Sequence, residues 1–409
     1  MKSTASLYNK LFLYSTLILW LASCSSLPIE PTSIQTDEIP TDTPIATTVP
    51  SHTPTPVPTH TSTSTPFPTY TPLPSPTPTE ILYVQEKTPI PPASPIITVG
   101  NAALVSAFSE WVVDGLTDME WTPDGSSLAA ATPSRIELYD VITREKWRSL
   151  FPKYAGARDI SFSPTGAWLA TSSRTGTEES GYTTYLEHWW GTDLKPYGLF
   201  GVEPRGLSDM EFNSNGLVLF TAFSTPTEED SSIEFWDIPA WENNRSMRTG
   251  TVLDISVSNF GQRMATTPDR YDIEIWDLNA TNKPLYTLPT SFTGAVTQAV
   301  FSPAGTLLAT AHYDGQINIW DAATGLLIRT ISTEPVVESL AFSPDGSLLV
   351  SGNSFGDNLV RIWQVDNGQL LRTLDGHTSG VTQLLFSPYG DIIATGSYDG
   401  QILIWGIRS

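Results

Sequence analysis

The sequence has a single cysteine, Cys24, in 409 residues. An intrachain disulfide framework and a cysteine-based zinc site are therefore both excluded. Basic residues are also scarce: 21 Lys and Arg stand against 43 Asp and Glu, and the net charge is −22. A chain this acidic repels phosphate backbones, so we expect no nucleic-acid partner. The fold must rest on a packed core, because no disulfide can hold it together.

Long apolar runs are missing as well, apart from one stretch near the N-terminus. Residues 11–22 (LFLYSTLILWLA) are apolar or small, and they follow Lys2 and Lys10. At about 12 residues the stretch is too short to span a bilayer, which takes about 20. It has the length and the flanking positive charge of a signal-peptide core. We therefore predict a signal peptide over residues 1–23.

The sequence LASC (Leu21–Cys24) follows this apolar stretch. It resembles the lipobox of bacterial lipoproteins, which has a leucine, two small residues and the cysteine. The resemblance implies that the Cys24 thiol is acylated and that cleavage leaves Cys24 as the mature N-terminus. A chance cysteine after an ordinary signal peptide and an uncleaved anchor are the alternatives. The lipoprotein interpretation predicts an extracytoplasmic protein that is anchored to the bacterial membrane, in the envelope or at the cell surface.

The segment after the cysteine is rich in proline and threonine. About half of the 33 prolines lie between Pro28 and Pro95, where Thr-Pro and Pro-Thr pairs repeat. Proline fixes φ and lacks a donor N–H, which excludes helices and central strands here. The segment also has too few clustered apolar residues to form a core. We predict that residues 24–98 form a lipidated, disordered stalk, which can extend by about 3.1 Å per residue.

The rest of the chain is repetitive. A turn of the type Ser-Pro-Asp-Gly (Ser343–Gly346) recurs seven times with substitutions, and its glycines are 41 to 50 residues apart by subtraction of their numbers. These glycines are Gly125, Gly166, Gly216, Gly261, Gly305, Gly346 and Gly390. Proline presets φ at the second turn position, and glycine suits the fourth. A period of about 40–45 residues is typical of a four-stranded propeller blade.

Trp-Asp pairs close the third strand of three repeats, at Trp236, Trp276 and Trp320. The repeat therefore resembles that of the WD-repeat β-propeller family, over about 310 residues. The resemblance implies an all-β fold, a seven-bladed propeller of four-stranded blades over residues 99–409. The last repeat stops after its third strand, so we expect residues 103–111 to supply the missing strand and close the ring.

His377, Ser397 and Asp399 have the side-chain types of a nucleophilic triad. The resemblance to WD repeats implies a different role for them. In that family Asp, His, Ser and Trp form a buried, hydrogen-bonded tetrad within one blade. His377, Ser397, Asp399 and Trp405 match this pattern. We therefore predict a structural tetrad in the last blade and no catalytic residue.

The other repeats lack the full tetrad. The fifth carries His312 at the position of Ser397, and no histidine precedes it, so we expect a less rigid blade there. No His, Asp and Glu cluster has the spacing of a metal site. No glycine-rich phosphate loop opens a helix. We therefore predict neither a cofactor nor a metal.

Two insertions lengthen the second and third repeats between their second and third strands, at residues 173–184 and 224–232. In WD-repeat proteins these loops lie on the face where partners often dock. The candidate partner-binding residues are Glu178, Glu179, Glu228, Glu229 and Asp230. Ordinary solvated loops are the alternative, because long surface loops tolerate insertions at little cost.

The sequence thus favours a monomeric, non-enzymatic protein-interaction scaffold at the cell envelope. Its partner would be an envelope protein or a wall polymer, and its membrane contact would be the lipid on Cys24. The alternatives are a propeller enzyme of the hydrolase or dehydrogenase type and a small-ligand sensor, both of which would use the central channel. An enzyme would need several inward-facing carboxylates or histidines from different blades.

Overall fold

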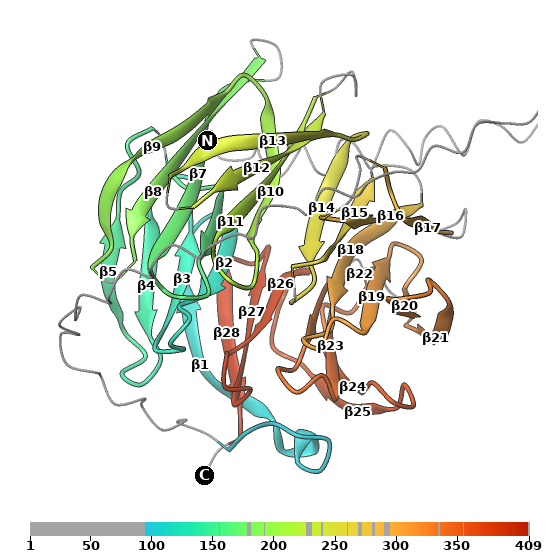
Figure 1. Cartoon of the computed structure of the whole chain (residues 1–409). Coiled ribbons are helices and arrows are strands. Elements are labelled where there is room, and N and C mark those ends of the chain that lie inside the picture. The colour runs from blue at the N-terminus through green and yellow to red at the C-terminus, as the bar shows by residue number, and fades with distance from the viewer. Residues whose placement is uncertain are drawn as a thin grey trace, which may run out of the picture. The chain divides into compact units, whose positions relative to one another are not determined.

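The structure is a computed structural model, and it describes residues 95–409 except 155, 178–180, 192, 226–230, 239, 260, 269–271, 280–282, 290–294, 334–335, 355 and 408–409. This part of the chain forms a ring of seven antiparallel sheets, each with four strands (Figure 1). The only helix among the described residues is the 3₁₀ turn η1 (Ala102–Leu104). The predicted all-β, seven-bladed fold is confirmed. Cys24, the predicted signal peptide and the predicted stalk up to residue 94 lie outside the described residues.

Each blade runs from a first strand near the ring axis, where the first strands of neighbouring blades contact one another, to a fourth strand at the rim. Blade one consists of β2 (Asp118–Trp121), β3 (Ser127–Ala131), β4 (Ile136–Asp140) and β5 (Lys146–Leu150). Blade two consists of β6 (Asp159–Phe162), β7 (Trp168–Thr177), β8 (Gly181–Trp190) and β9 (Lys195–Glu203). Blade three consists of β10 (Gly206–Phe212), β11 (Val218–Ser224), β12 (Ser232–Asp237) and β13 (Glu242–Arg248).

Blades four to seven follow the same order, except that the last blade takes its rim strand from the start of the ring. They are β14 (Val252–Val257), β15 (Arg263–Pro268), β16 (Ile273–Asp277) and β17 (Tyr286–Leu288); β18 (Val296–Phe301), β19 (Leu307–His312), β20 (Gln316–Asp321) and β21 (Leu327–Ser332); β22 (Val336–Phe342), β23 (Leu348–Ser354), β24 (Val360–Gln364) and β25 (Leu370–Leu374); and β26 (Val381–Phe386), β27 (Ile392–Ser397), β28 (Gln401–Gly406) and β1 (Ser106–Val112).

Two kinds of turn residue shape the blades, a glycine that occurs in all seven and the aspartate of the Trp-Asp pair, which occurs in three. The seven repeat glycines have φ between 60° and 74°, which side-chain-bearing residues rarely adopt. Each closes a tight hairpin, as where Gly346 N–H donates to the Ser343 carbonyl at 2.8 Å. The aspartate of the Trp-Asp pair closes the turn before the fourth strand. Asp321 Oδ1 accepts the N–H groups of Ala323 and Thr324 at 3.0 and 2.8 Å.

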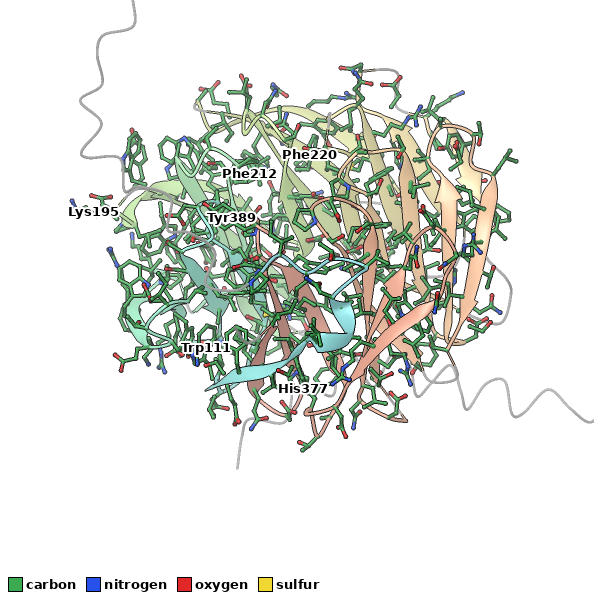
Figure 2. All side chains as sticks on the ribbon, turned by 90° about the horizontal axis from the view of Figure 1, so that it is seen from below. Trp111, Lys195, Phe212, Phe220, His377 and Tyr389 are labelled. Atoms are coloured by element: carbon green, nitrogen blue, oxygen red, sulfur yellow. The ribbon has the colours of Figure 1, made fainter. Side chains whose placement is uncertain are left out.

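The hydrophobic core is divided among the seven seams between blades. Each of seven clusters of buried side chains combines residues of two adjacent blades. Phe212 belongs to the cluster between blades two and three, and Phe220 to the next one, whereas Lys195 lies at the rim (Figure 2). Each blade is therefore buried on both faces, which explains why its second strand is a run of apolar and small residues rather than an alternating one.

The two ends of the described ring meet in blade seven. β1 pairs antiparallel with β28, from Ser106 opposite Gly406 to Val112 opposite Gln401. Packing against the ring starts before this strand, and two residues before the predicted boundary at residue 99. Ile97 is 1% exposed within a core cluster, and its N–H donates to the Gly390 carbonyl at 2.8 Å.

Deleting residues 95–112 should give a protein that aggregates, because β28 becomes an exposed edge and two seam cores lose residues from the start of the ring. Size-exclusion chromatography and thermal unfolding measure this outcome. Deleting residues 28–90 instead should leave Tm unchanged. A monomeric ring with unchanged Tm after the first deletion would contradict this role of β1.

Candidate functional site

One hydrogen bond recurs in six blades, where the indole N–H of a third-strand tryptophan donates to a hydroxyl on the second strand. The pairs are Trp189–Thr171 (3.1 Å), Trp236–Thr221 (2.9 Å), Trp276–Thr266 (3.1 Å), Trp320–Thr310 (3.0 Å), Trp363–Ser351 (3.0 Å) and Trp405–Thr395 (2.8 Å). In blade one, Ala130 and Tyr139 occupy these two places. The Tyr139 hydroxyl donates to Glu137 at 2.7 Å instead. Blade one thus lacks both the hydroxyl and the indole of this bond, so neither group is present there without its partner.

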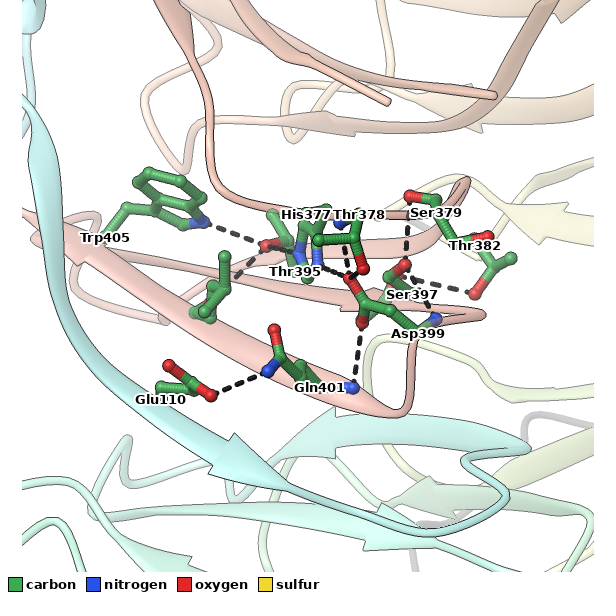
Figure 3. Close-up of polar contacts among 12 residues, drawn as sticks. Glu110, His377, Thr378, Ser379, Thr382, Thr395, Ser397, Asp399, Gln401 and Trp405 are labelled. Atoms are coloured by element: carbon green, nitrogen blue, oxygen red, sulfur yellow. Dashed lines mark hydrogen bonds and ion pairs between the residues drawn. The ribbon is translucent and has the colours of Figure 1, made fainter. Parts of the chain in front are cut away.

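In blade seven this bond extends into a longer chain (Figure 3). Thr395 Oγ1 lies 2.7 Å from His377 Nε2, and His377 Nδ1 lies 3.1 Å from Asp399 Oδ2. Burial lowers the pKa of His377 although Asp399 opposes it, so the imidazole is neutral at pH 7. A neutral imidazole has one N–H. Nδ1 therefore donates to Asp399, while Nε2 accepts from Thr395, which in turn accepts from Trp405.

Ser397 is not part of this chain, and its predicted place in the tetrad is wrong. Its hydroxyl donates to the Ser379 carbonyl at 3.0 Å and accepts the Asp399 N–H at 3.1 Å, which closes the β27–β28 turn. Thr395 and Ser397 point to the same face of β27 because they are two residues apart. Only Thr395 reaches His377 and Trp405. The serine–histidine contact of a catalytic triad is thus missing, and Thr395 is 0% exposed, out of reach of a substrate.

Blade five builds a similar chain with a histidine from a different place. His312 ends β19, and its Nε2 lies 2.9 Å from Thr310 Oγ1, which accepts the Trp320 indole N–H. The same ring nitrogen lies 3.2 Å from the amide nitrogen of Asn318. His312, at 1% exposure, supplies the imidazole that the sequence analysis found missing here. This arrangement offers no support for the less rigid blade that we expected.

A polar cleft of about 340 Å³ lies where the β9–β10 and β11–β12 connections meet β13. Its lining residues are Pro204, Arg205, Thr225, Ser231, Ser232, Glu234, Ser246 and Arg248. Thr225 and Ser231 flank the insertion that the sequence analysis selected in the third repeat. The five acidic candidates, Glu178, Glu179, Glu228, Glu229 and Asp230, lie outside the described residues.

Arg205 organises this cleft, and the sequence analysis did not identify it. Its Nη2 lies 2.7 Å from Glu203 Oε2 and 3.1 Å from Glu234 Oε1, and its Nη1 donates to Ser232 at 2.6 Å. Burial raises the pKa of Glu234, but hydrogen bonds from Ser232 and Arg205 outweigh burial, and the pKa is lowered overall. Arg205 is thus compensated by two carboxylates, whereas the side chain of Arg248 is exposed at the rim.

The first strands supply the inward carboxylates that an enzyme in the channel would need. Asp118 and Glu120 of β2 accept the backbone N–H groups of Ile160 and Phe162 in blade two, at 2.8 and 2.6 Å. Asp209, Glu211 and Asp254 make the same kind of bond to the blade that follows theirs. These oxygens join neighbouring blades. Among the described residues, no group of three or more His, Cys, Asp or Glu is placed to hold a metal.

A closed ring of seven four-stranded blades, with Trp–hydroxyl bonds in six of them and Trp-Asp turns in three, defines a β-propeller of the WD type. Three segments match the sequence model of the WD domain, G-beta repeat, at residues 282–321, 325–364 and 368–406. The chain therefore contains WD40 repeats. Each match covers the fourth strand of one blade and the first three of the next, so the sequence repeat is offset from the blade by one strand.

Curated relatives share parts of this region. The chain is similar to transducin beta-like protein 3 of Bos taurus (29% identical over 179 residues, 39% of this chain and 22% of that protein). It is also similar to autophagy-related protein 16 of Arabidopsis thaliana (26% over 208 residues, 50% and 39%) and to WD repeat and SOCS box-containing protein 1 of Homo sapiens (36% over 103 residues, 25% and 24%). The chain thus spans well under half of the length of these relatives. WD propellers typically serve as protein-interaction scaffolds.

Replacing Thr395 by Val should lower the free energy of unfolding by about 2 kcal/mol, because buried groups of His377 and Trp405 both lose their partner. Chemical denaturation measures the change. The variant Thr395→Ser keeps the hydroxyl and should retain most of the stability. Equal losses in the two variants would show that the methyl group, not the hydrogen-bonded chain, matters here.

Proposed function

We propose that the protein is a non-enzymatic interaction scaffold of the bacterial envelope, held outside the cytoplasm by a lipid on Cys24. Its binding face would lie over blades two and three, and its partner would be an envelope protein or a wall polymer. The observation that carries this proposal is the polar cleft around Arg205, beside the insertion of the third repeat. The cleft offers both charges and several hydroxyls, a composition that suits a polar partner surface.

The shape of blade two supports the same face. β7 and β8 have 10 residues each, which makes them the longest of the described strands. They carry the second-repeat insertion at their connecting loop. In WD-type propellers that loop is on the same face as the β11–β12 connection, so two insertions of adjacent blades would flank the cleft. A ring with a separate core in every seam can hold such loops in fixed positions.

The channel offers less support for an enzyme or a sensor. Five of its carboxylates accept backbone N–H groups, as described above, and they are thereby committed to the ring. The hydroxyl that contacts His377 is that of Thr395, which is buried. The anchor part of the proposal rests on residues 1–24 of the sequence. Within the described residues, no helix has the length and apolar character needed to cross a bilayer.

The Cys24→Ser variant should stay uncleaved and unlipidated, because no other thiol can accept the lipid. Intact mass and partition into detergent phase measure this. Ser25→Ala keeps the thiol and serves as the matched control. If the Cys24→Ser protein has the processed mass and still follows the membrane fraction, the anchor proposal is wrong.

Neutralising the acidic loops should weaken partner capture by about tenfold, or 1.4 kcal/mol. The variant combines Glu178→Gln, Glu179→Gln, Glu228→Gln, Glu229→Gln and Asp230→Asn. The measurement is the amount of protein or wall polymer that copurifies with the tagged full chain from detergent-solubilised envelope. We expect one stoichiometric partner with the unmodified chain.

A control variant neutralises four exposed carboxylates outside these loops, with Glu145→Gln, Glu242→Gln, Asp366→Asn and Asp375→Asn. It should capture the partner normally. Equal losses of partner capture in both variants would show that overall charge, and not these loops, causes the loss. Undiminished capture by the loop variant would move the site away from blades two and three.

A further inference from the structure

The inner wall of the ring is divided by charge. Seven residues before each repeat glycine, blades one to four carry aspartate, whereas blades five to seven carry glutamine or serine. In blade order these residues are Asp118, Asp159, Asp209, Asp254, Gln298, Ser339 and Gln383. Glu120 and Glu211 add two more carboxyl groups, two residues further on in blades one and three. The wall of blades one to four therefore has six carboxyl groups at these positions, and the opposite wall has none.

The four aspartates form two pairs across blade seams. Asp118 and Asp209 each accept, at 2.8 Å, the N–H of the residue that follows the other aspartate, Ile160 after Asp159 and Ile255 after Asp254. This brings the side chain of Asp118 into hydrogen-bond contact with that of Asp159, and the side chain of Asp209 into contact with that of Asp254. An ionised carboxylate only accepts hydrogen bonds, so each pair requires a proton on one of its members. Two ionised carboxylates in such close contact would instead repel each other.

The neighbours decide which member keeps the proton. In the first pair, Asp118 accepts the N–H of Ile160 at 2.8 Å and the amide of Gln383 at 3.1 Å, which favours its ionised form. Burial, followed by the charges of Asp118 and Asp209, raises the pKa of Asp159 well above its usual value. Burial raises the pKa of Asp118 too, but its two hydrogen bonds favour Asp159 as the member that holds the proton.

The second pair follows the same pattern. Asp209 accepts the N–H of Ile255 at 2.8 Å, whereas Asp254 accepts that of Ala299 at only 3.3 Å. Burial raises the pKa of Asp209 to about 6, and burial with the charge of Asp209 raises the pKa of Asp254 well above its usual value. The shorter bond to Asp209 favours Asp254 as the member that holds the proton of this pair. All four aspartates keep part of their surface exposed, so water can exchange these protons.

The titratable groups that face the pairs are themselves acidic, and burial, followed by the charges of Asp118 and Asp209, raises the pKa values of Glu120 and Glu211 well above their usual value. Glu120 and Glu211 act on them from the same strands. The strands β18 and β26, which flank the acidic wall, contribute the uncharged amides of Gln298 and Gln383. Arg158 precedes Asp159 in the chain, but its electrostatic partners are Arg174 and Tyr182 of its own blade. Arg158 is therefore not placed to neutralise the pairs, which leaves protons to do so.

We propose that the ring holds one shared proton in each aspartate pair, and that the seams between blades one and two and between blades three and four loosen when these protons leave. The proposal is independent of the partner and of the anchor. Because each proton-holding carboxyl has a higher pKa in the folded ring than in the unfolded chain, the folded state binds more protons. Stability should therefore fall as pH rises from about 4 through the raised pKa values.

The test compares Tm of the full chain and of Asp159→Asn between pH 5 and pH 8.5. An amide donates to Asp118 at every pH, so the variant keeps the hydrogen bond without a titrating proton. We expect its Tm at pH 8.5 to exceed that of the unmodified protein by about 2 °C, with no gain at pH 5. The difference between the two curves cancels groups that they share, such as His188, whose pKa burial lowers to about 4.

Glu145→Gln, on an exposed turn, is the control and should follow the unmodified protein at every pH. Parallel curves for Asp159→Asn and the unmodified protein would overturn the proposal. A gain in Tm from added Ca²⁺ at pH 8.5, absent in Asp159→Asn, would also overturn it, because a cation would then be neutralising the pair.

A second measurement detects the protons directly. The infrared C=O stretch of protonated carboxyl groups should be present in the unmodified protein at pH 7 and should vanish on unfolding at the same pH. The band should be weaker in Asp159→Asn, whereas Glu120 and Glu211, whose pKa values are also raised, contribute equally to both proteins. Absence of the band from the folded protein at pH 7 would show that the pairs hold no proton.

Discussion

The antiparallel ladder between β1 and β28 is the contact on which the rest of the ring depends. Six blades are each built from one continuous stretch of chain, whereas blade seven joins strands from both ends of the ring. Each seam has its own core, and each core needs a blade on either side. Breaking the ladder would expose the strand edges of β1 and β28, and it would remove the residues that β1 and the segment before it contribute to the adjoining seam cores. The one-strand offset between sequence repeat and blade is what makes this ladder possible.

The seams are closed in two different ways. On the inner wall, side chains of most blades accept a backbone N–H of the following blade. In the described part of the chain, no such bond runs from Asp159 to blade three, because Asp159 turns back to Asp118. An aromatic cluster holds that seam instead. The rings of Trp168 and His188 lie 5.3 and 4.3 Å from that of Trp241. The proposed binding face would therefore lie over a seam that is held by an aromatic cluster.

The fold was predictable from the sequence because its signals are local. A turn glycine with positive φ and an aspartate that caps the next turn act within a few residues, so each repeat reveals its own hairpins. Side-chain partners across strands were harder to predict. Thr395 and Ser397 point to the same face of one strand. Which of their hydroxyls joins the hydrogen-bonded chain depends on where the rings of Trp405 and His377 lie along that strand. The Asp118–Asp159 pair and the cleft around Arg205 depend on how adjacent blades are inclined, which spacing along the chain does not encode.

The position of β1 has a mechanical consequence. The chain enters the ring at Ile97, whose N–H is bonded to Gly390, and it runs directly into the ladder from Ser106 to Val112. A pull on the segment before residue 95 would reach the body of the ring through these bonds first. Along the strand axis, the load is shared by all the hydrogen bonds of the ladder in shear, whereas a pull across it would break them one by one. The resistance of the ring to force therefore depends on the direction of the pull.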